Sequence, residues 1–263
     1  MDLRILVIGD IVGKPGRRVL EQRLPAFIER EKIDFVIANA ENASGGAGLT
    51  PNVADRFLSL GIDILTGGDH TFQRREIFPM MQENLRIVRP ANYPEGTVGR
   101  GVTVVESRGG HSIGVINALG RVFMPPMNCP FHEIDRCLRT IASKTSTIIV
   151  DFHAEATSEK VAMGWHLDGR VSAVVGTHTH IQTADERILP KGTAYLTDLG
   201  MTGAYDSVIG REKDCVLRRF VTQLPTKYEM AEGDEKICGA VVVVDAQTGK
   251  ARSIERVQVQ GDN

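Results

Sequence analysis

Side chains that can bind a metal ion or move a proton follow five apolar, strand-like segments of this 263-residue chain. They are, in chain order, Asp10, Glu41, Asn42, Asp69, His70, Asp151, His153, His178 and His180. The carboxyl ends of parallel strands meet at one edge of a sheet, where ligands bind in α/β proteins. His178 and His180 are two residues apart, so in an extended backbone both would point to the same side. We therefore expect these side chains to form one cluster.

Each of these residues has an ordinary structural explanation when it is taken alone. An aspartate after a strand commonly caps a turn, the glycines after Asn42 permit a bend, and His153 can be a hydrogen-bonded histidine of the core. Packed together, however, three carboxylates without a cation would repel one another. The cluster as a whole therefore favours a metal site. The remaining histidines, His111, His132 and His166, receive only a structural interpretation.

The ligand types favour a metal centre of a particular kind. Oxygen and nitrogen ligands without cysteine suit iron, manganese or zinc better than calcium or a thiolate site. The six or seven candidate ligands exceed one tetrahedral site, which favours two metal ions that share a ligand. Two metal ions ~3.5–4 Å apart are the usual apparatus for displacement at phosphorus. The pattern therefore indicates chemistry at phosphorus.

The loop after the first apolar run has the outline of a nucleotide-binding loop but lacks its parts. The motif G-x-x-x-x-G-K-[ST] needs one more residue between Gly9 and Lys14 than the chain has. Pro15 provides neither a hydroxyl group for Mg²⁺ nor an N–H for phosphate, and it fits the first turn of a helix instead. We expect Lys14, Arg17 and Arg18 to be solvated charges on that helix.

Residues 110–114, GHSIG, match the G-x-S-x-G nucleophile elbow of serine hydrolases. That motif has meaning only where a strand, a sharp turn and a helix follow one another. Here an apolar, β-type run follows Ser112, which favours a hairpin turn. The match is therefore interpreted as accidental.

The elements that must position the cluster alternate between strand-like and helix-like segments in the first part of the chain, which predicts parallel strands with crossover helices. These segments are 5–9, 16–32, 34–40, 50–61, 62–68, 75–85 and 86–90. The later segments are a hairpin over 101–119, a helix over 131–144, strands over 146–155 and 171–180, and strand-rich regions over 192–198 and 239–259. Since no repeat or long linker interrupts the chain, we expect a single α/β domain over residues 1–263 with a mixed or partly antiparallel second sheet.

Composition limits the classes of partner and location. The formal charge is −2 and the pI is about 6.4, so there is no basic excess for nucleic acid or for an anionic membrane surface. The four cysteines are widely spaced and typical of reduced thiols. No apolar stretch approaches the ~20 residues of a membrane helix, and no signal-peptide pattern is present. We expect a cytoplasmic protein with no membrane association and no stable nucleic-acid partner.

Six blocks of the sequence together resemble the calcineurin-like metallophosphoesterase superfamily and, within it, the YmdB-like branch. They are GDIVGKPGR (9–17), NAENASGGAGLT (39–50), GGDHTF (67–72), RPANYPEGTVGRG (89–101), DFHAEATSEK (151–160) and GTHTHIQTADERILPKGTAYLTDLGMTG (176–203). The resemblance implies a four-layer α/β/β/α sandwich with mixed sheets and two metal ions, with iron or manganese ahead of zinc or magnesium. It also implies a phosphodiesterase for 2′,3′-cyclic or 3′,5′-cyclic nucleotides, and a homo-oligomer, either dimer or tetramer.

The resemblance further assigns roles to the cluster. One metal ion would be held by Asp10, Asn42 and His180, the other by Asp69, His153 and His178, and both would be bridged by Glu41. His70 would be the catalytic proton donor or a substrate-positioning residue.

Two positions depart from the superfamily pattern. Most members have Asp-x-His at the first strand, whereas Asp10 is followed by Ile11 and Val12 here, as is normal for the YmdB-like branch, where Asn42 supplies the replacement ligand. Asp69 stands where an asparagine is usual, which adds one negative charge to the second metal site.

We therefore expect a metal-dependent phosphoric diester hydrolase. A hydroxide between the metal ions would attack phosphorus in line, and His70 would protonate the departing ribose oxygen. The alternative is a metal-stabilised regulatory or scaffold protein with little turnover, because ligands for structure and for catalysis have the same chemistry. A serine hydrolase is the alternative that the G-x-S-x-G match would require.

Overall fold

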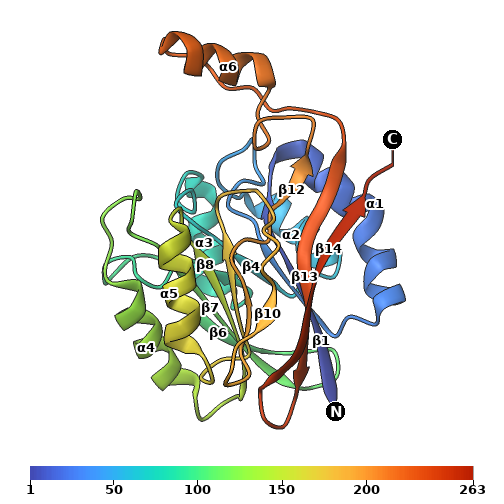
Figure 1. Ribbon diagram of the computed structural model, residues 1–263, viewed down its shortest axis with the longest axis vertical. Helices are drawn as coiled ribbons and strands as arrows, with labels where there is room; N and C mark the ends of the chain where they lie inside the picture. Colours follow the sequence, from blue (N-terminus) through green and yellow to red (C-terminus); the bar gives the residue numbers. More distant parts are fainter. Residues whose placement is uncertain (263) are drawn as a thin grey trace.

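Two β-sheets pack face to face in the computed structural model, which describes residues 1–262, and helices cover the outer face of each sheet (Figure 1). Three separate hydrophobic clusters fill the three interfaces between these four layers. Both sheets contain parallel and antiparallel pairs. The predicted four-layer α/β/β/α arrangement with mixed sheets is therefore confirmed.

The first sheet has the strand order β2-β12-β13-β1-β3-β4-β5, and β14 pairs with β13 beside this path. Its strands are β1 (Asp2–Ile8), β2 (Asp10–Ile11), β3 (Phe35–Asn39), β4 (Ile64–Thr66), β5 (Ile87–Val88), β12 (Met201–Ala204), β13 (Glu235–Asp245) and β14 (Ala251–Gln260). The run β1-β3-β4-β5 is parallel, as predicted. Strands β13 and β14 form an antiparallel hairpin that includes the strand-rich region predicted near the end of the chain.

The second sheet has the strand order β10-β11-β9-β8-β7-β6. Its strands are β6 (Val102–Glu106), β7 (Ser112–Leu119), β8 (Thr147–His153), β9 (Ala173–Thr177), β10 (Arg187–Ile188) and β11 (Ala194–Leu196). The four central strands are parallel, and the two edge strands are antiparallel to their neighbours. Strands β6 and β7 form the predicted hairpin, so Ser112 begins a strand and does not occupy a nucleophile elbow.

Helices pack on the two outer faces of the sheets. The first sheet is covered by α1 (Gly13–Glu31), α2 (Pro51–Ser59), η1 (Arg75–Ile77) and α3 (Phe78–Glu83), and the second by α4 (Pro130–Ile141) and α5 (Thr157–Leu167). The sequence analysis did not predict α5 or α6 (Lys213–Thr222), and α6 stands apart from the layers (Figure 1). Pro15 lies in the first turn of α1, as predicted. Among the described helices, none is long and apolar enough to cross a membrane.

Strand β1 shows how the sequence assigns side chains to the layers. Leu3, Ile5 and Val7 belong to the cluster between the sheets, whereas Leu6 and Ile8 belong to the cluster beneath the helices. Successive side chains of a strand point to opposite faces, so a strand covered on both faces is apolar throughout. The polar residue that follows such a strand is therefore held in the interior at a fixed position.

The close approach of Gly9 to Gly200 allows a test of this arrangement. A Cβ atom at Gly9 would lie 1.8 Å from the Gly200 carbonyl oxygen, which belongs to the backbone and cannot move alone. We expect Gly9→Ala to lower the free energy of unfolding by ~3 kcal/mol or more, the upper end for an overpacked core. Urea denaturation measures the change. Gly109→Ala, where the nearest atom is 3.6 Å away, is the matched control, and equal midpoints for the two variants would contradict the contact.

Candidate metal centre

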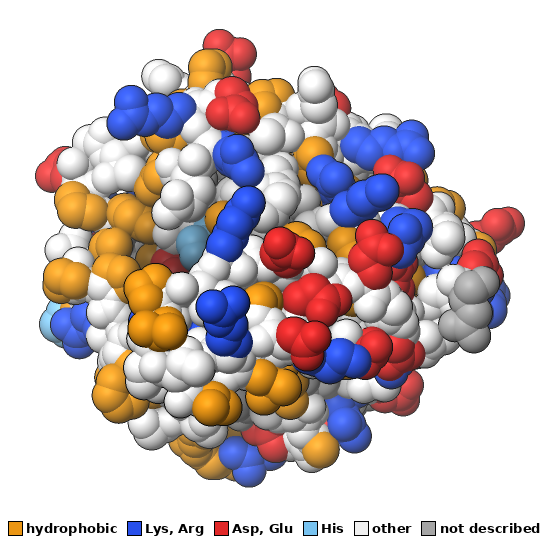
Figure 2. Space-filling model, turned by 90° about the horizontal axis from the view of Figure 1, so that it is seen from above, with side chains coloured by type: hydrophobic (Ala, Val, Ile, Leu, Met, Phe, Trp, Pro, Cys, Tyr) orange, Lys and Arg blue, Asp and Glu red, His pale blue; other side chains and the backbone are white. Residues whose placement is uncertain are grey.

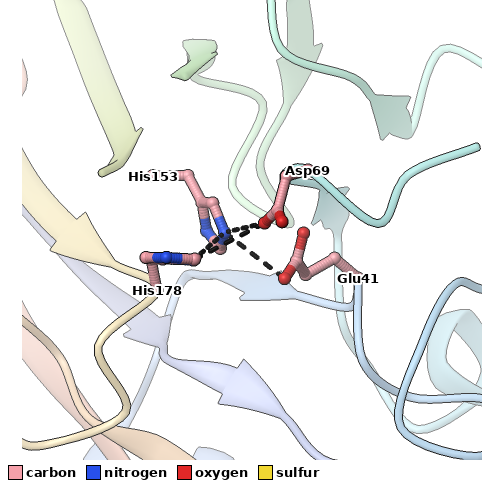
Figure 3. Close-up of side chains that lie close together, drawn as sticks. All are labelled: Glu41, Asp69, His153 and His178. Atoms are coloured by element: carbon pink, nitrogen blue, oxygen red, sulfur yellow. Dashed lines mark hydrogen bonds and ion pairs between the residues drawn. The ribbon is translucent and has the colours of Figure 1, made fainter. Parts of the chain in front are cut away.

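Glu41, Asp69, His153 and His178 converge at the carboxyl ends of strands from both sheets (Figure 3). Each offers one ligand atom, and the four atoms lie within 4.8 Å of one another. Glu41 follows β3 and Asp69 follows β4 in the first sheet, whereas His153 ends β8 and His178 follows β9 in the second. Two carboxylates and two imidazoles at one point are a donor set that suits a first-row transition metal ion.

Asp10, Asn42 and His180 lie beside this cluster. His180 Nε2 is 3.9 Å from Asp10 Oδ1 and 3.3 Å from Asn42 Nδ2. Asn42 Nδ2 also donates to Glu41 Oε1 at 3.0 Å, and the same Glu41 oxygen is 3.3 Å from His153 Nε2. Glu41 thus contacts both groups, as a bridging carboxylate must. A metal ligand has to present oxygen, so Asn42 fits the predicted role only with its amide turned over.

Asp10 carries the clearest sign that a cation belongs here. Its side chain is completely buried, and Oδ2 accepts the backbone N–H of His178 at 2.9 Å. Its Oδ1 has no hydrogen-bond partner among the described residues. Burial is the largest cause that raises the pKa of this carboxyl group. Because a buried carboxylate oxygen without a partner is costly, Asp10 fits the role of a metal ligand.

Three imidazoles each turn one nitrogen toward the cluster and the other toward an oxygen atom, by a hydrogen bond for His153 and His180 and by an ion pair with the exposed Glu155 for His178. The outer pairs are His153 Nδ1 with Thr177 Oγ1 (2.9 Å), His178 Nε2 with Glu155 Oε2 (3.1 Å) and His180 Nδ1 with the Ile209 carbonyl oxygen (3.0 Å). When the outer nitrogen donates its hydrogen, the inner nitrogen keeps a lone pair for a metal ion. This arrangement is usual for metal-binding histidines, so the donor set fits a metal centre.

The sequence analysis missed these three outer partners. Glu155 stands two residues after His153, and Thr177 directly precedes His178. Nearness to a candidate ligand in the sequence is therefore a usable signal for both. Ile209 contributes only its carbonyl oxygen, so no side-chain type could have revealed its role.

The partner of His153 belongs to a buried polar network. Thr177 donates its hydroxyl hydrogen to Asp151 Oδ1 at 2.7 Å, so His153 must donate to Thr177. Asp151 Oδ2 also accepts hydrogen bonds from Thr66 at 2.5 Å and Asn39 at 3.1 Å. Burial raises the pKa of Asp151 to about 6. Asp151 was one of the candidate residues at the strand ends. The structure places it behind His153, where it contacts Thr177, and outside the cluster.

The turn that carries His178 and His180 differs from the extended backbone that their spacing indicates. Strand β9 ends at Thr177, and φ is 96° at His178 and 65° at His180, in the left-handed region that most residues avoid. His178 Nδ1 reaches to within 3.5 Å of Asp69 Oδ1, whereas His180 turns toward Asp10. The expectation that both would share one side of a strand was wrong because the strand stops before them.

The carboxylates and imidazoles of the cluster stabilise one another's charges. Burial is the largest single effect and raises the pKa of Glu41, but His153 and His70 together hold it well below its usual range. Burial acts in the same way on Asp69, and hydrogen bonds with His153 and His178 lower its pKa overall. Burial lowers the pKa of His153, but Glu41, Asp69 and Asp10 raise it well above its usual value. A bound cation would take the place of these protons beside the carboxylates.

His70 lies at the mouth of the centre. Its Nδ1 is 2.7 Å from Asn42 Oδ1 and 3.3 Å from Glu41 Oε1, and its side chain is 36% exposed. The hydrogen bond with Glu41 is the largest cause that raises the pKa of His70. Figure 2, which views the molecule from this end, shows a histidine in a recess between hydrophobic side chains and a row of Lys and Arg side chains. The side chains of Asp69 and His178 are each 22% exposed, so a small molecule can reach the centre beside His70.

Other residues that the sequence analysis named have structural surroundings. His132 and His166 lie in α4 and α5, and His111 lies in the turn between β6 and β7. Arg18 was expected to be a solvated charge, but its Nε donates to Oε2 of the buried Glu235 at 2.9 Å. The Arg18 side chain is still 41% exposed, so it is a solvated charge on the helix as expected, and it also ties α1 to the start of β13.

Comparisons with known proteins agree over almost the whole chain. The model of the YmdB-like protein family matches residues 6–257. A 2′,3′-cyclic-nucleotide 2′-phosphodiesterase of Bacillus subtilis is 48% identical over 261 residues, which cover 99% of this chain and 98% of that protein.

Two solved structures have the same fold. A hypothetical protein from Thermus thermophilus has a TM-score of 0.91 and 39% identity, over 99% of this chain and 100% of that chain. A protein from Mycoplasma pneumoniae, described as a novel phosphatase, has a TM-score of 0.92 and 32% identity, over 100% of this chain and 95% of that chain. The similarity extends over both sheets and therefore over both halves of the candidate centre.

The central place of Glu41 generates a prediction about metal binding. Glu41→Gln removes a charge that lies between the two groups of candidate ligands. We therefore expect metal affinity to fall by at least ~100-fold, which is more than most substitutions of residues that only orient a metal ligand. Metal analysis after dialysis against a dilute metal buffer measures the loss. Glu235→Gln, which changes a buried glutamate paired with Arg18, is the matched control. Full metal content in Glu41→Gln would exclude the bridging role.

Proposed function

The chain belongs to the YmdB-like protein family, and we propose that it is a metal-dependent phosphoric diester hydrolase. The observation that carries the proposal is the set of three imidazoles, each with an oxygen atom beside its outer nitrogen, around an unpartnered, buried Asp10 oxygen. We infer two metal ions bridged by Glu41. The ligands of the first would be Asp10, Asn42 and His180, and those of the second Asp69, His153 and His178.

A pair of metal ions supplies, when bound, an activated hydroxide and positive charge for the phosphoryl oxygens. The residues of the chain prepare the place where this chemistry occurs. The hydrogen bond to Thr177 orients the ring of His153, and the ion pair with Glu155 favours the observed direction of His178. Asp69, in place of the neutral amide that the superfamily pattern has, holds a cation more tightly, because a carboxylate adds charge to the bond.

His70 is the proposed general acid. Its Nδ1 lies 3.3 Å from Glu41 Oε1, an acceptor that stays in place when the Asn42 amide turns over, so Nε2 is the nitrogen free to carry a proton toward a substrate. A departing ribose oxygen is a poor leaving group, and its protonation by a positioned imidazole typically accelerates the reaction by ~10²–10⁴-fold. The partial exposure of the ring places it where substrate enters.

The relative from Bacillus subtilis, by its name, acts on 2′,3′-cyclic nucleotides, and its identity of 48% supports the same substrate class for this chain. Hydrolysis would open the five-membered cyclic phosphate and leave a nucleoside monophosphate. The 3′,5′-cyclic nucleotides are the second class, and iron or manganese is the predicted metal, ahead of zinc or magnesium.

One assay tests the proposed function. Purified protein is analysed for metal and then offered 2′,3′-cyclic nucleotides, 3′,5′-cyclic nucleotides and phosphomonoesters, before and after chelation and after addition of Mn²⁺. We expect turnover of the 2′,3′-cyclic forms that is lost on chelation and restored by Mn²⁺. A metal-loaded protein that hydrolyses none of them would favour the scaffold alternative. Light scattering on the same sample measures the predicted dimer or tetramer.

A leaving-group comparison tests the role of His70. His70→Ala keeps the backbone N–H that donates to Glu41 Oε2 at 3.0 Å, so both metal ions should stay bound. We expect kcat to fall by ~10²-fold or more for a 2′,3′-cyclic nucleotide, whose alkoxide needs a proton. The fall should be much smaller for bis(p-nitrophenyl) phosphate. Loss of metal from the variant, or equal losses of rate for the two substrates, would contradict the assignment.

A further inference from the structure

A buried ion pair lies behind the turn that carries His178 and His180. Lys160 of α5 is 2% exposed, and its Nζ donates to Asp198 Oδ2 at 2.6 Å. Asp198 is completely buried in the loop between β11 and β12. Two buried charges stabilise a fold no better than a well-packed apolar pair of similar volume, because their desolvation is costly. Their presence at this depth therefore calls for another explanation.

The carboxylate of Asp198 holds the backbone of that turn. Its Oδ2 accepts the Thr179 hydroxyl hydrogen at 2.7 Å and the Thr179 backbone N–H at 3.2 Å. Its Oδ1 accepts the N–H of Gly200 at 2.8 Å. Thr179 is the residue between the two histidines, so both of its polar hydrogens are tied to one charged atom. Lys160 supplies the opposite charge beside that atom.

The backbone on each side of Thr179 needs such a restraint. His178 and His180 both have left-handed φ values, which residues other than glycine keep only where the surroundings enforce them. The ends of the turn are held by two bonds, from the His178 N–H to Asp10 Oδ2 at 2.9 Å and from the Met201 N–H to the His180 carbonyl oxygen at 3.0 Å. The N–H in the middle of the turn depends on the buried ion pair.

We propose that Lys160 and Asp198 are positioning residues of the metal centre. Their ion pair fixes Thr179, and the fixed turn directs His178 toward Asp69 and His180 toward Asp10. Neither residue touches a metal ion or a substrate. The inference rests on the metal centre proposed above, because the directions of the two imidazoles matter only where both bind metal.

Substitutions of Thr179 isolate the effect. Thr179→Val removes the hydroxyl bond but leaves the ion pair and the side-chain size almost unchanged, whereas Thr179→Ser keeps the hydroxyl. Asp198→Asn removes the charge itself. We expect Thr179→Val and Asp198→Asn to weaken Mn²⁺ binding by ~10–100-fold, the range for groups that orient metal ligands, and Thr179→Ser to bind as the wild type does. Titration with Mn²⁺ alone, followed by the paramagnetic resonance signal of free Mn²⁺, gives affinity and stoichiometry.

Asp168→Asn is the matched control. Asp168 is also a buried carboxylate, 6% exposed, and accepts the backbone N–H of Lys191 at 3.1 Å just after the C-terminal end of α5. We expect Asp168→Asn and Asp198→Asn both to lower the urea midpoint, but only Asp198→Asn to change Mn²⁺ affinity. A purely structural role would leave affinity unchanged in every folded variant.

The outcomes separate this inference from the metal centre on which it rests. Folded Thr179→Val that binds Mn²⁺ as tightly as the wild type would overturn the positioning role, even if Asp198→Asn fails to fold. A wild-type protein that binds no Mn²⁺ would overturn the metal centre, and the positioning role with it. Weak binding in Thr179→Val with full recovery in Thr179→Ser supports both.

Discussion

The face-to-face packing of the two sheets decides whether the centre exists, because each sheet supplies a different kind of ligand. The proposed oxygen ligands lie in or just after strands of the first sheet, and the proposed imidazole ligands lie in or just after strands of the second; they are Asp10, Glu41, Asn42 and Asp69, and His153, His178 and His180. A slip of one sheet over the other by a single residue, ~3.3 Å, would separate the two sets beyond any coordination distance. The apolar cluster between the sheets therefore positions the candidate metal site as well as forming the core.

Directional bonds fix that packing at the end where the ligands lie. Asn39 and Thr66 of the first sheet both donate to Asp151 of the second, and the Gly67 N–H donates to Asn117 Oδ1 at 3.2 Å. Apolar contacts have no preferred direction, whereas hydrogen bonds do. The network therefore specifies the alignment of the sheets where the apolar interface alone would tolerate a shift. This alignment requires the Asp151 carboxyl group to be buried, and burial raises its pKa.

The sequence allowed most of the strands and most of the cluster to be predicted, because both depend on local patterns. The short strands β2, β10 and β12 were not predicted. Apolar runs identify strands that are buried on both faces, and the residue after such a run lies at the sheet edge. The path of the backbone beyond a strand end depends on partners far away in the chain, and this explains the wrong expectation for His178 and His180. The ion pair of Lys160 and Asp198 could not be predicted for the same reason. The two residues are 38 positions apart, and neither residue type by itself indicates a buried partner. Whether the cluster binds two ions stays a prediction.

Several features that a fold selected for stability alone would avoid lie at this edge of the sheets. Asp10 has a buried oxygen without a partner, His178 and His180 have left-handed backbones, and Lys160 carries a charge into the core. Proteins tolerate such departures where function requires them. Here each departure has the same consequence, which is to hold a ligand atom or to aim one. A cation would satisfy the unpartnered oxygen and separate the crowded carboxylates at once, so the proposed metal centre accounts for the strained turn and the buried charges together.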